Sequence, residues 1–280
     1  MKTAVYQSAV SSDIGENCRK MEAALREAAL RKTDLVVFPE CALTGYPPRD
    51  IPAAKAIDST KVEQCIDALL AVSAETGVAI LFGTVARENG KYYNRAVFLS
   101  PDGGKTVYDK RALWGWDREN FTAGDRDGIA EYRGFRIGIR ICFEVRFPEY
   151  FRELYHAGTD VNIVLFYDVA DTPDEARYNL IKGHLQTRAT ENVCPIITAN
   201  AAKPYPTAPT AVFGRSGEVL AEFGDGIKAS RCATAAGSEA ELEGFVEYEL
   251  QKQELNFGEQ GRREISDALT GCEPACVKNA

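Results

Sequence analysis

Three residues with complementary chemistry each follow an apolar run of the chain. Glu40 comes directly after LVVFP, Lys110 after TVYD, and Cys142 after IGIRI. Ligands of open α/β sheets bind beyond the carboxyl ends of the strands. If the three runs are parallel neighbouring strands, a carboxylate, an ammonium and a thiol converge on one edge of the sheet. This set predicts nucleophilic chemistry by the thiol.

The three groups have distinct roles in such chemistry. A thiol near its ordinary pKa is mostly protonated at neutral pH, so a nucleophilic cysteine needs a base or a nearby cation. Glu40 is the candidate base, because an apolar setting next to Phe38 and Pro39 raises the pKa of a carboxyl. Lys110 favours the thiolate and can donate to a developing oxyanion, and the backbone N–H of Phe143 is a natural second donor.

Histidine and metal chemistry are weaker alternatives. The chain has two histidines, His156 and His184, and both fall in predicted helices rather than at strand ends. No HxH or HExxH pair is present, so we predict neither a Cys–His pair nor a metal site.

Apolar patterning predicts an α/β protein with mixed sheets and outer helices. Several apolar runs are continuous, which is typical of strands covered on both faces. The predicted strands are 4–10, 35–38, 78–85, 96–99, 106–108, 135–142, 161–166, 195–199, 211–213 and 245–248. The predicted helices are 15–32, 57–76, 148–157 and 174–192. Turn residues indicate consecutive strands over 78–110 and a hairpin over 208–224.

Composition excludes several classes of protein. The chain has 280 residues, of which 45% are hydrophobic, and this is enough to bury a sizeable core. A net charge of −8 without long basic runs argues against a nucleic-acid partner. The most apolar stretch, 161–167, contains Asn162 and is far below the roughly 20 residues of a membrane span. The start does not read as a signal peptide, and the eight cysteines are scattered without a CxxC pair, so we expect a cytoplasmic protein.

Five segments carry a resemblance to a known family. In chain order they are FPECALTGY (38–46), YDKRAL (108–113), FTAGD (121–125), RICFEVRFPE (140–149) and TRATEN (187–192). Together they resemble the nitrilase superfamily of carbon–nitrogen hydrolases, over about residues 3–250. The resemblance implies a four-layer α-β-β-α sandwich, a Glu–Lys–Cys triad and no cofactor. On this chain the triad is Glu40, Lys110 and Cys142.

The resemblance also implies a second glutamate before the FTAGD segment. Glu119 matches by residue type, whereas Asp117 matches better by its spacing from Gly124. We favour Glu119, because the family residue is a glutamate and loop lengths vary in this region.

The residues around the predicted pocket depart from the family pattern and leave the substrate open. Ala112 stands where a histidine is common, Phe143-Glu144 where Tyr-Asp is common, and Tyr167-Asp168 where small residues are common. The predicted substrate-binding residues are Tyr46, Phe143, Glu144, Phe166 and Tyr167. Arg140 and Arg146 could bind a substrate carboxylate, or Glu144 and Asp168 an amine. Trp114 and Trp116 could close over the pocket or pack on a partner subunit.

The resulting hypothesis is a cofactor-independent hydrolase with a Cys142 thioester intermediate. It cleaves a non-peptide C–N bond of a small amide or N-carbamoyl compound and releases a carboxylic acid and ammonia. The alternatives are a non-catalytic scaffold with the same fold and an acyltransferase that uses the same thioester. We expect one catalytic domain over residues 1–250, a polar tail over 251–280 with Cys272 and Cys276, and, from the resemblance, a homodimer or larger homo-oligomer.

Overall fold

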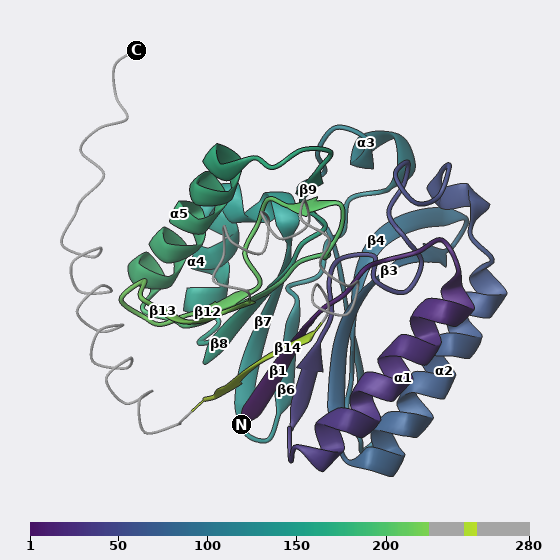
Figure 1. The fold of residues 1–280 in the computed structure, drawn as a ribbon, viewed down its shortest axis with the longest axis horizontal. Coiled ribbons are helices and arrows are strands. Elements are labelled where there is room, and N and C mark those ends of the chain that lie inside the picture. Colours follow the sequence, from purple (N-terminus) through teal and green to yellow (C-terminus); the bar gives the residue numbers. More distant parts are fainter. Residues whose placement is uncertain (224–243, 251–280) are drawn as a thin grey trace.

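Two six-stranded mixed sheets form the centre of the computed structural model, which describes residues 1–223 and 244–250 (Figure 1). The first sheet has the order β14-β1-β2-β3-β4-β5, with β1 Lys2–Gln7, β2 Leu35–Val37, β3 Ala79–Glu88, β4 Lys91–Leu99, β5 Lys105–Asp109 and β14 Gly244–Glu249. The second has the order β13-β12-β10-β8-β7-β6, with β6 Ile129–Tyr132, β7 Phe135–Ile141, β8 Val161–Leu165, β10 Ile196–Ala199, β12 Ala211–Phe213 and β13 Val219–Glu222. A small pair joins β9 Val169–Ala170 to β11 Tyr205–Pro206.

Helices cover the outer face of each sheet. The helices are α1 Ile14–Leu30, α2 Ser59–Thr76, α3 Asp117–Asn120, α4 Pro148–His156 and α5 Glu175–Asn192, with 3-10 turns η1 Ala54–Ala56 and η2 Cys142–Arg146. Figure 1 shows α1 and α2 beside one sheet and α4 and α5 beside the other. Within the described ranges, no helix is long and apolar enough to cross a bilayer.

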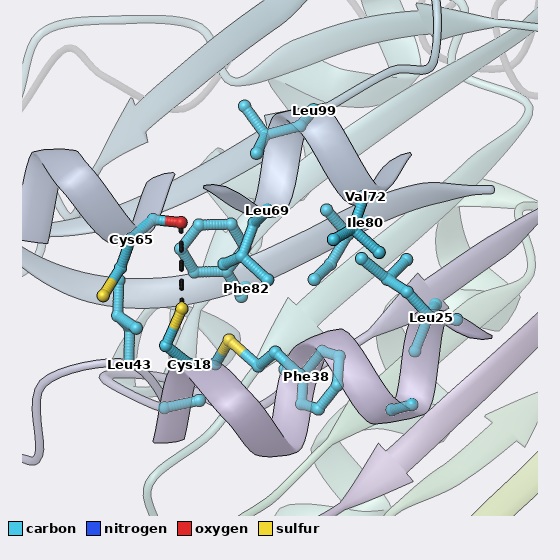
Figure 2. Close-up of a cluster of buried hydrophobic side chains, with 14 of the residues drawn as sticks. Cys18, Leu25, Phe38, Leu43, Cys65, Leu69, Val72, Ile80, Phe82 and Leu99 are labelled. Carbon is cyan, nitrogen blue, oxygen red and sulfur yellow. Dashed lines mark hydrogen bonds between the residues drawn. The ribbon is translucent and has the colours of Figure 1, made fainter. Parts of the chain in front are cut away.

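The continuous apolar runs explain why there are four layers. Along β2, Leu35 and Val37 belong to the core between the two sheets, whereas Val36 belongs to the core beneath α1 and α2. Alternate residues of a strand point to opposite faces, so a strand that is apolar throughout must be covered on both. Figure 2 shows the helix-side core, in which Leu25 of α1 and Leu69 of α2 lie near Phe38, Ile80 and Phe82 of the sheet region. The predicted α-β-β-α sandwich is confirmed.

The element boundaries follow local signals in the sequence. The Asp58 side chain caps α2 by accepting from the N–H of Lys61, and Gly77 ends the helix at φ 72°. Gly is favoured there because this left-handed conformation strains other residues. The consecutive strands predicted over 78–110 are confirmed as β3, β4 and β5, which pair antiparallel, and the predicted hairpin is confirmed as β12 and β13. The predicted tail 251–280, with Cys272 and Cys276, lies outside the described residues.

Candidate active site

The three strand-end residues meet at one end of the sandwich but not from neighbouring strands. Strands β2 and β3 are parallel, and β4 is antiparallel to both β3 and β5, so β5 runs in the direction of β2. Glu40 and Lys110 therefore follow strands that end at the same edge of the first sheet. Cys142 follows β7 of the second sheet. The condition that all three are parallel neighbours is not met, because the site forms where the two sheets face each other.

A buried ammonium between two carboxylates forms the centre of this site. The Lys110 Nζ lies 2.8 Å from Glu40 Oε1 and 2.8 Å from Asp117 Oδ2. Lys110 is 2% exposed, Glu40 1% and Asp117 0%. Glu40 also accepts from Asn94 Nδ2 at 2.7 Å and from the N–H of Tyr167 at 2.8 Å. An ammonium has three N–H donors, so Lys110 keeps one for a further acceptor.

Burial and the ion pairs set the protonation of this centre. Burial raises the pKa of Glu40, and the neighbouring charge of Lys110 only partly opposes this shift. Burial lowers the pKa of Lys110, but the charges of Glu40 and Asp117 outweigh it and hold that pKa well above the ordinary lysine value. Lys110 therefore remains an ammonium, while Glu40 is a stronger base than a solvated glutamate.

Cys142 occupies the sharp turn in which β7 passes into η2. Its φ is 46°, a conformation that is uncommon for residues other than glycine. Burial raises the pKa of the Cys142 thiol, the charge of Glu40 raises it further, and the charge of Lys110 opposes both. The thiol is therefore protonated at rest, and the residue is only half-buried, so it remains open to a ligand.

A cavity of about 200 Å³ opens onto this centre. Aromatic and charged side chains line it together. The lining residues include Lys110, Asp117, Cys142, Tyr46, Phe143, Phe166, Tyr167, Trp114 and Trp116, together with Arg49, Arg146 and Arg177. Four of the five predicted substrate-binding residues therefore line it, namely Tyr46, Phe143, Phe166 and Tyr167. Trp114 and Trp116 line the cavity with roughly half of each side chain exposed.

The second acidic residue beside the lysine is Asp117 rather than Glu119. Asp117 Oδ1 accepts from the Tyr46 hydroxyl at 2.7 Å, and Oδ2 accepts from the N–H of Trp114 at 3.2 Å. Two residues of a helix differ by about 200° in direction, so when Asp117 faces Lys110 the side chain two positions later faces away. Glu119 is exposed. The placement expected for Glu119 is therefore wrong, and the spacing from Gly124 was the better signal.

Glu144 does not face the cavity. Its carboxylate is fully buried and accepts from the hydroxyl of Tyr108 and from the backbone N–H groups of Arg111, Ala112 and Ile141. A carboxylate with these bonds is not available to a substrate. The expectation that Glu144 binds substrate is wrong, because the turn after Cys142 directs it into the protein.

Asn94 and Arg177 were not singled out in the sequence, and Asp168, Arg140 and Arg146 were considered there only as groups that bind a substrate. Asn94 interrupts the apolar pattern of β4, and this was the available signal for its contact with Glu40. Arg177 of α5 forms two 2.7 Å bonds to Asp168, and both residues line the cavity. Asp168 is thus already paired with a cation. Arg140 is fully buried and bonded to backbone carbonyls, whereas Arg146 lines the cavity.

Known proteins resemble this chain in both sequence and fold. The family model described as carbon-nitrogen hydrolase matches residues 2–230. An (R)-stereoselective amidase of a Pseudomonas species is 33% identical over 134 residues, which cover 47% of this chain and 47% of that enzyme. Omega-amidase YafV of Yersinia enterocolitica is 30% identical over 201 residues, 71% of this chain and 73% of that enzyme. The solved amidase of Nesterenkonia sp. AN1 shares the fold, with a TM-score of 0.75 and 20% identity over 96% of this chain and 99% of that one.

Proposed function

Because the chain belongs to the carbon-nitrogen hydrolase family, we propose that it hydrolyses a small amide or N-carbamoyl compound through a thioester on Cys142. An amide yields a carboxylic acid and ammonia, whereas an N-carbamoyl compound yields ammonia, carbon dioxide and the free amine. The observation that carries the proposal is the Glu40–Lys110–Asp117 centre, which faces the same cavity as the half-buried thiol.

The first half of the reaction forms the thioester. Glu40 takes the Cys142 proton while Sγ attacks the carbonyl carbon, since the raised pKa of Glu40 brings a carboxylate base closer to the pKa of a thiol. The third N–H of Lys110 and the backbone N–H of Phe143 stabilise the oxyanion. The C–N bond then breaks, and Glu40 gives its proton to the departing nitrogen, which leaves as ammonia.

The second half of the reaction releases the acid. Water enters the position that ammonia has left, and Glu40 takes one of its protons as the oxygen attacks the thioester carbonyl. The C–S bond breaks, and the proton on Glu40 returns to the sulfur. Asp117 keeps Lys110 oriented through both halves, since their 2.8 Å ion pair is independent of the proton on Glu40.

Ammonia release over a panel of small amides and N-carbamoyl compounds tests this proposal. The panel contains glutamine, glutaramate, succinamate, N-carbamoyl-β-alanine and N-carbamoylputrescine. We expect turnover of at least one compound, and Cys142→Ala to lower it by about 10³-fold or more, because removal of a nucleophile abolishes the covalent route. Cys65→Ala is the matched control, since Cys65 lies in the helix-side core and should leave turnover unchanged.

Two outcomes would contradict the proposal. Turnover that survives in Cys142→Ala would exclude the thioester. Silence of the wild type across the panel, together with no selective alkylation of Cys142, would favour the non-catalytic scaffold. Addition of hydroxylamine separates hydrolysis from acyl transfer, because an enzyme built for transfer would form the hydroxamate in preference to the acid.

A further inference from the structure

A buried carboxylate outside the cavity joins the two strand ends that supply Lys110 and Cys142. Glu144 Oε1 accepts from the Tyr108 hydroxyl at 2.8 Å, from the N–H of Arg111 at 2.7 Å and from the N–H of Ala112 at 3.3 Å. Its Oε2 accepts from the N–H of Ile141 at 2.7 Å. One oxygen therefore binds the end of β5, and the other binds the end of β7.

These two strand ends belong to different sheets. The backbone of Lys110 is fixed within its own surroundings, because its N–H donates to the Asn94 carbonyl at 2.9 Å and its carbonyl accepts from the N–H of Gly124 at 3.0 Å. Neither of these contacts is made with β7 itself. Glu144 binds Arg111, the residue after the lysine, and Ile141, the residue before the cysteine.

The surroundings of Glu144 suit a fixed link rather than a reactive group. The residue is 0% exposed, and in the described part of the chain its donors are a phenol and three backbone N–H groups, with no lysine or arginine in an ion pair. Burial and the neighbouring carboxylate raise the pKa of Tyr108, so the phenol stays a donor. The guanidinium carbon of Arg140 lies 5.2 Å from the centre of the Tyr108 ring, in a cation–π contact.

We infer that Glu144 is a positioning residue that fixes the Lys110 ammonium relative to the Cys142 thiol across the two sheets. This inference rests on the proposed function only for its catalytic consequence. Displacement of a catalytic group by about 1 Å can cost about 10²-fold in rate even when the changed residue is remote from the chemistry.

Glu144→Gln tests the link. A glutamine side chain has one acceptor oxygen and one NH₂ group, which is a donor. The NH₂ group would face a backbone N–H at one of the two strand ends, so the hydrogen bond to that strand end is lost. We expect kcat to fall by about 10- to 100-fold, with KM changed by less than about threefold. We also expect the pH profile for alkylation of Cys142 by iodoacetamide to move upward by about half a unit or more, because Lys110 no longer lowers the pKa of the thiol to the same extent.

Glu153→Gln is the matched control. Glu153 Oε1 accepts from the Arg111 guanidinium at 2.8 Å, so this variant removes a carboxylate charge near the same strand end without touching the backbone bonds. We expect kcat and the alkylation profile to stay within about twofold of the wild type. Tyr108→Phe removes one of the four donors and should move both readouts in the direction of Glu144→Gln by a smaller amount.

The outcomes separate positioning from general stability. A folded Glu144→Gln protein with wild-type kcat and alkylation profile overturns the inference, even if its melting temperature is lower. If Glu144→Gln does not fold, Tyr108→Phe decides, and an unchanged alkylation profile overturns the inference. Because alkylation needs no substrate, a shifted profile in a chain that turns over no amide would uphold the link and reject the proposed function.

Discussion

Two thiols of this protein, one buried and one half-buried, have different surroundings. Cys18 lies in the helix-side core, where its Sγ contacts the backbone carbonyl of Cys65 at 3.9 Å (Figure 2). Cys142 lies in the turn after β7, on a cavity that also holds Lys110. Burial is the largest cause of a raised pKa for both thiols.

The difference between them lies in their neighbours. Around Cys18, the side chains of Cys65 and Glu22 both raise the pKa of the thiol further, so they only disfavour the thiolate. Around Cys142, a cation opposes the shift and a carboxylate of raised pKa can accept the proton. A raised thiol pKa alone therefore does not separate a structural cysteine from a nucleophile, whereas a paired base and cation do.

The largest effect is expected when the Asp117 charge is removed from the Glu40–Lys110–Asp117 centre, which is what distinguishes the surroundings of Cys142 from those of Cys18. We expect Asp117→Asn to lower kcat by about 10²-fold, because a neutral amide holds the Lys110 ammonium less firmly in its catalytic position. Steady-state ammonia release measures this effect. Glu119→Gln is the control and should retain wild-type turnover, since Glu119 is exposed. The reverse pattern would restore Glu119 as the acidic residue of the site.

Selective alkylation compares the two thiols directly. With limiting iodoacetamide at neutral pH, we expect Cys142 in the folded protein to react about tenfold or more faster than Cys18, because a base and an open cavity serve only Cys142. Peptide mass spectrometry after short exposure gives both rates. Equal rates in the folded protein would mean that the surroundings of Cys142 do not activate it.

A smaller effect is expected from the amide that supports Glu40. The Asn94 hydrogen bond lowers the pKa of Glu40, so Asn94→Ala should raise that pKa. The acid limb of kcat/KM, which rises as Glu40 loses its proton, should move to higher pH by about half to one unit. A pH series of initial rates measures the shift. A limb that stays in place or moves to lower pH would exclude Glu40 as the titrating base.

Cover on both faces of the strands was predictable because the strands are continuous apolar runs, whereas the four-layer order came from the family resemblance. Runs such as LVV in β2 are buried on both faces, and this requires cover on each side of the sheet. The short strands β6, β9 and β11 were not predicted. Pairs such as Val169–Ala170 are too short to give a periodic signal, and β6 begins immediately after a glycine and carries only a brief apolar pattern.

The site was predictable where residue type at a strand end carried the signal, as for Glu40, Lys110 and Cys142. It was not predictable where side-chain direction decides the outcome. Asp117 and Glu119 are two positions apart, and only the way in which α3 starts determines which one faces Lys110. Glu144 likewise lies two residues after Cys142, yet the turn directs its side chain away from the cavity.

The Glu40–Lys110–Asp117 centre carries one net negative charge when both carboxylates are ionised. In the proposed reaction, the thiol proton neutralises Glu40 at the moment when negative charge appears on the carbonyl oxygen. The total charge of the site is then the same before and after the attack. Moving an ion from water into a low-dielectric interior costs free energy, and in this protein the carboxylates lose their water when the chain folds rather than during the reaction. Each turnover shifts one negative charge from one oxygen to another within the site, and no ion needs to enter from solvent.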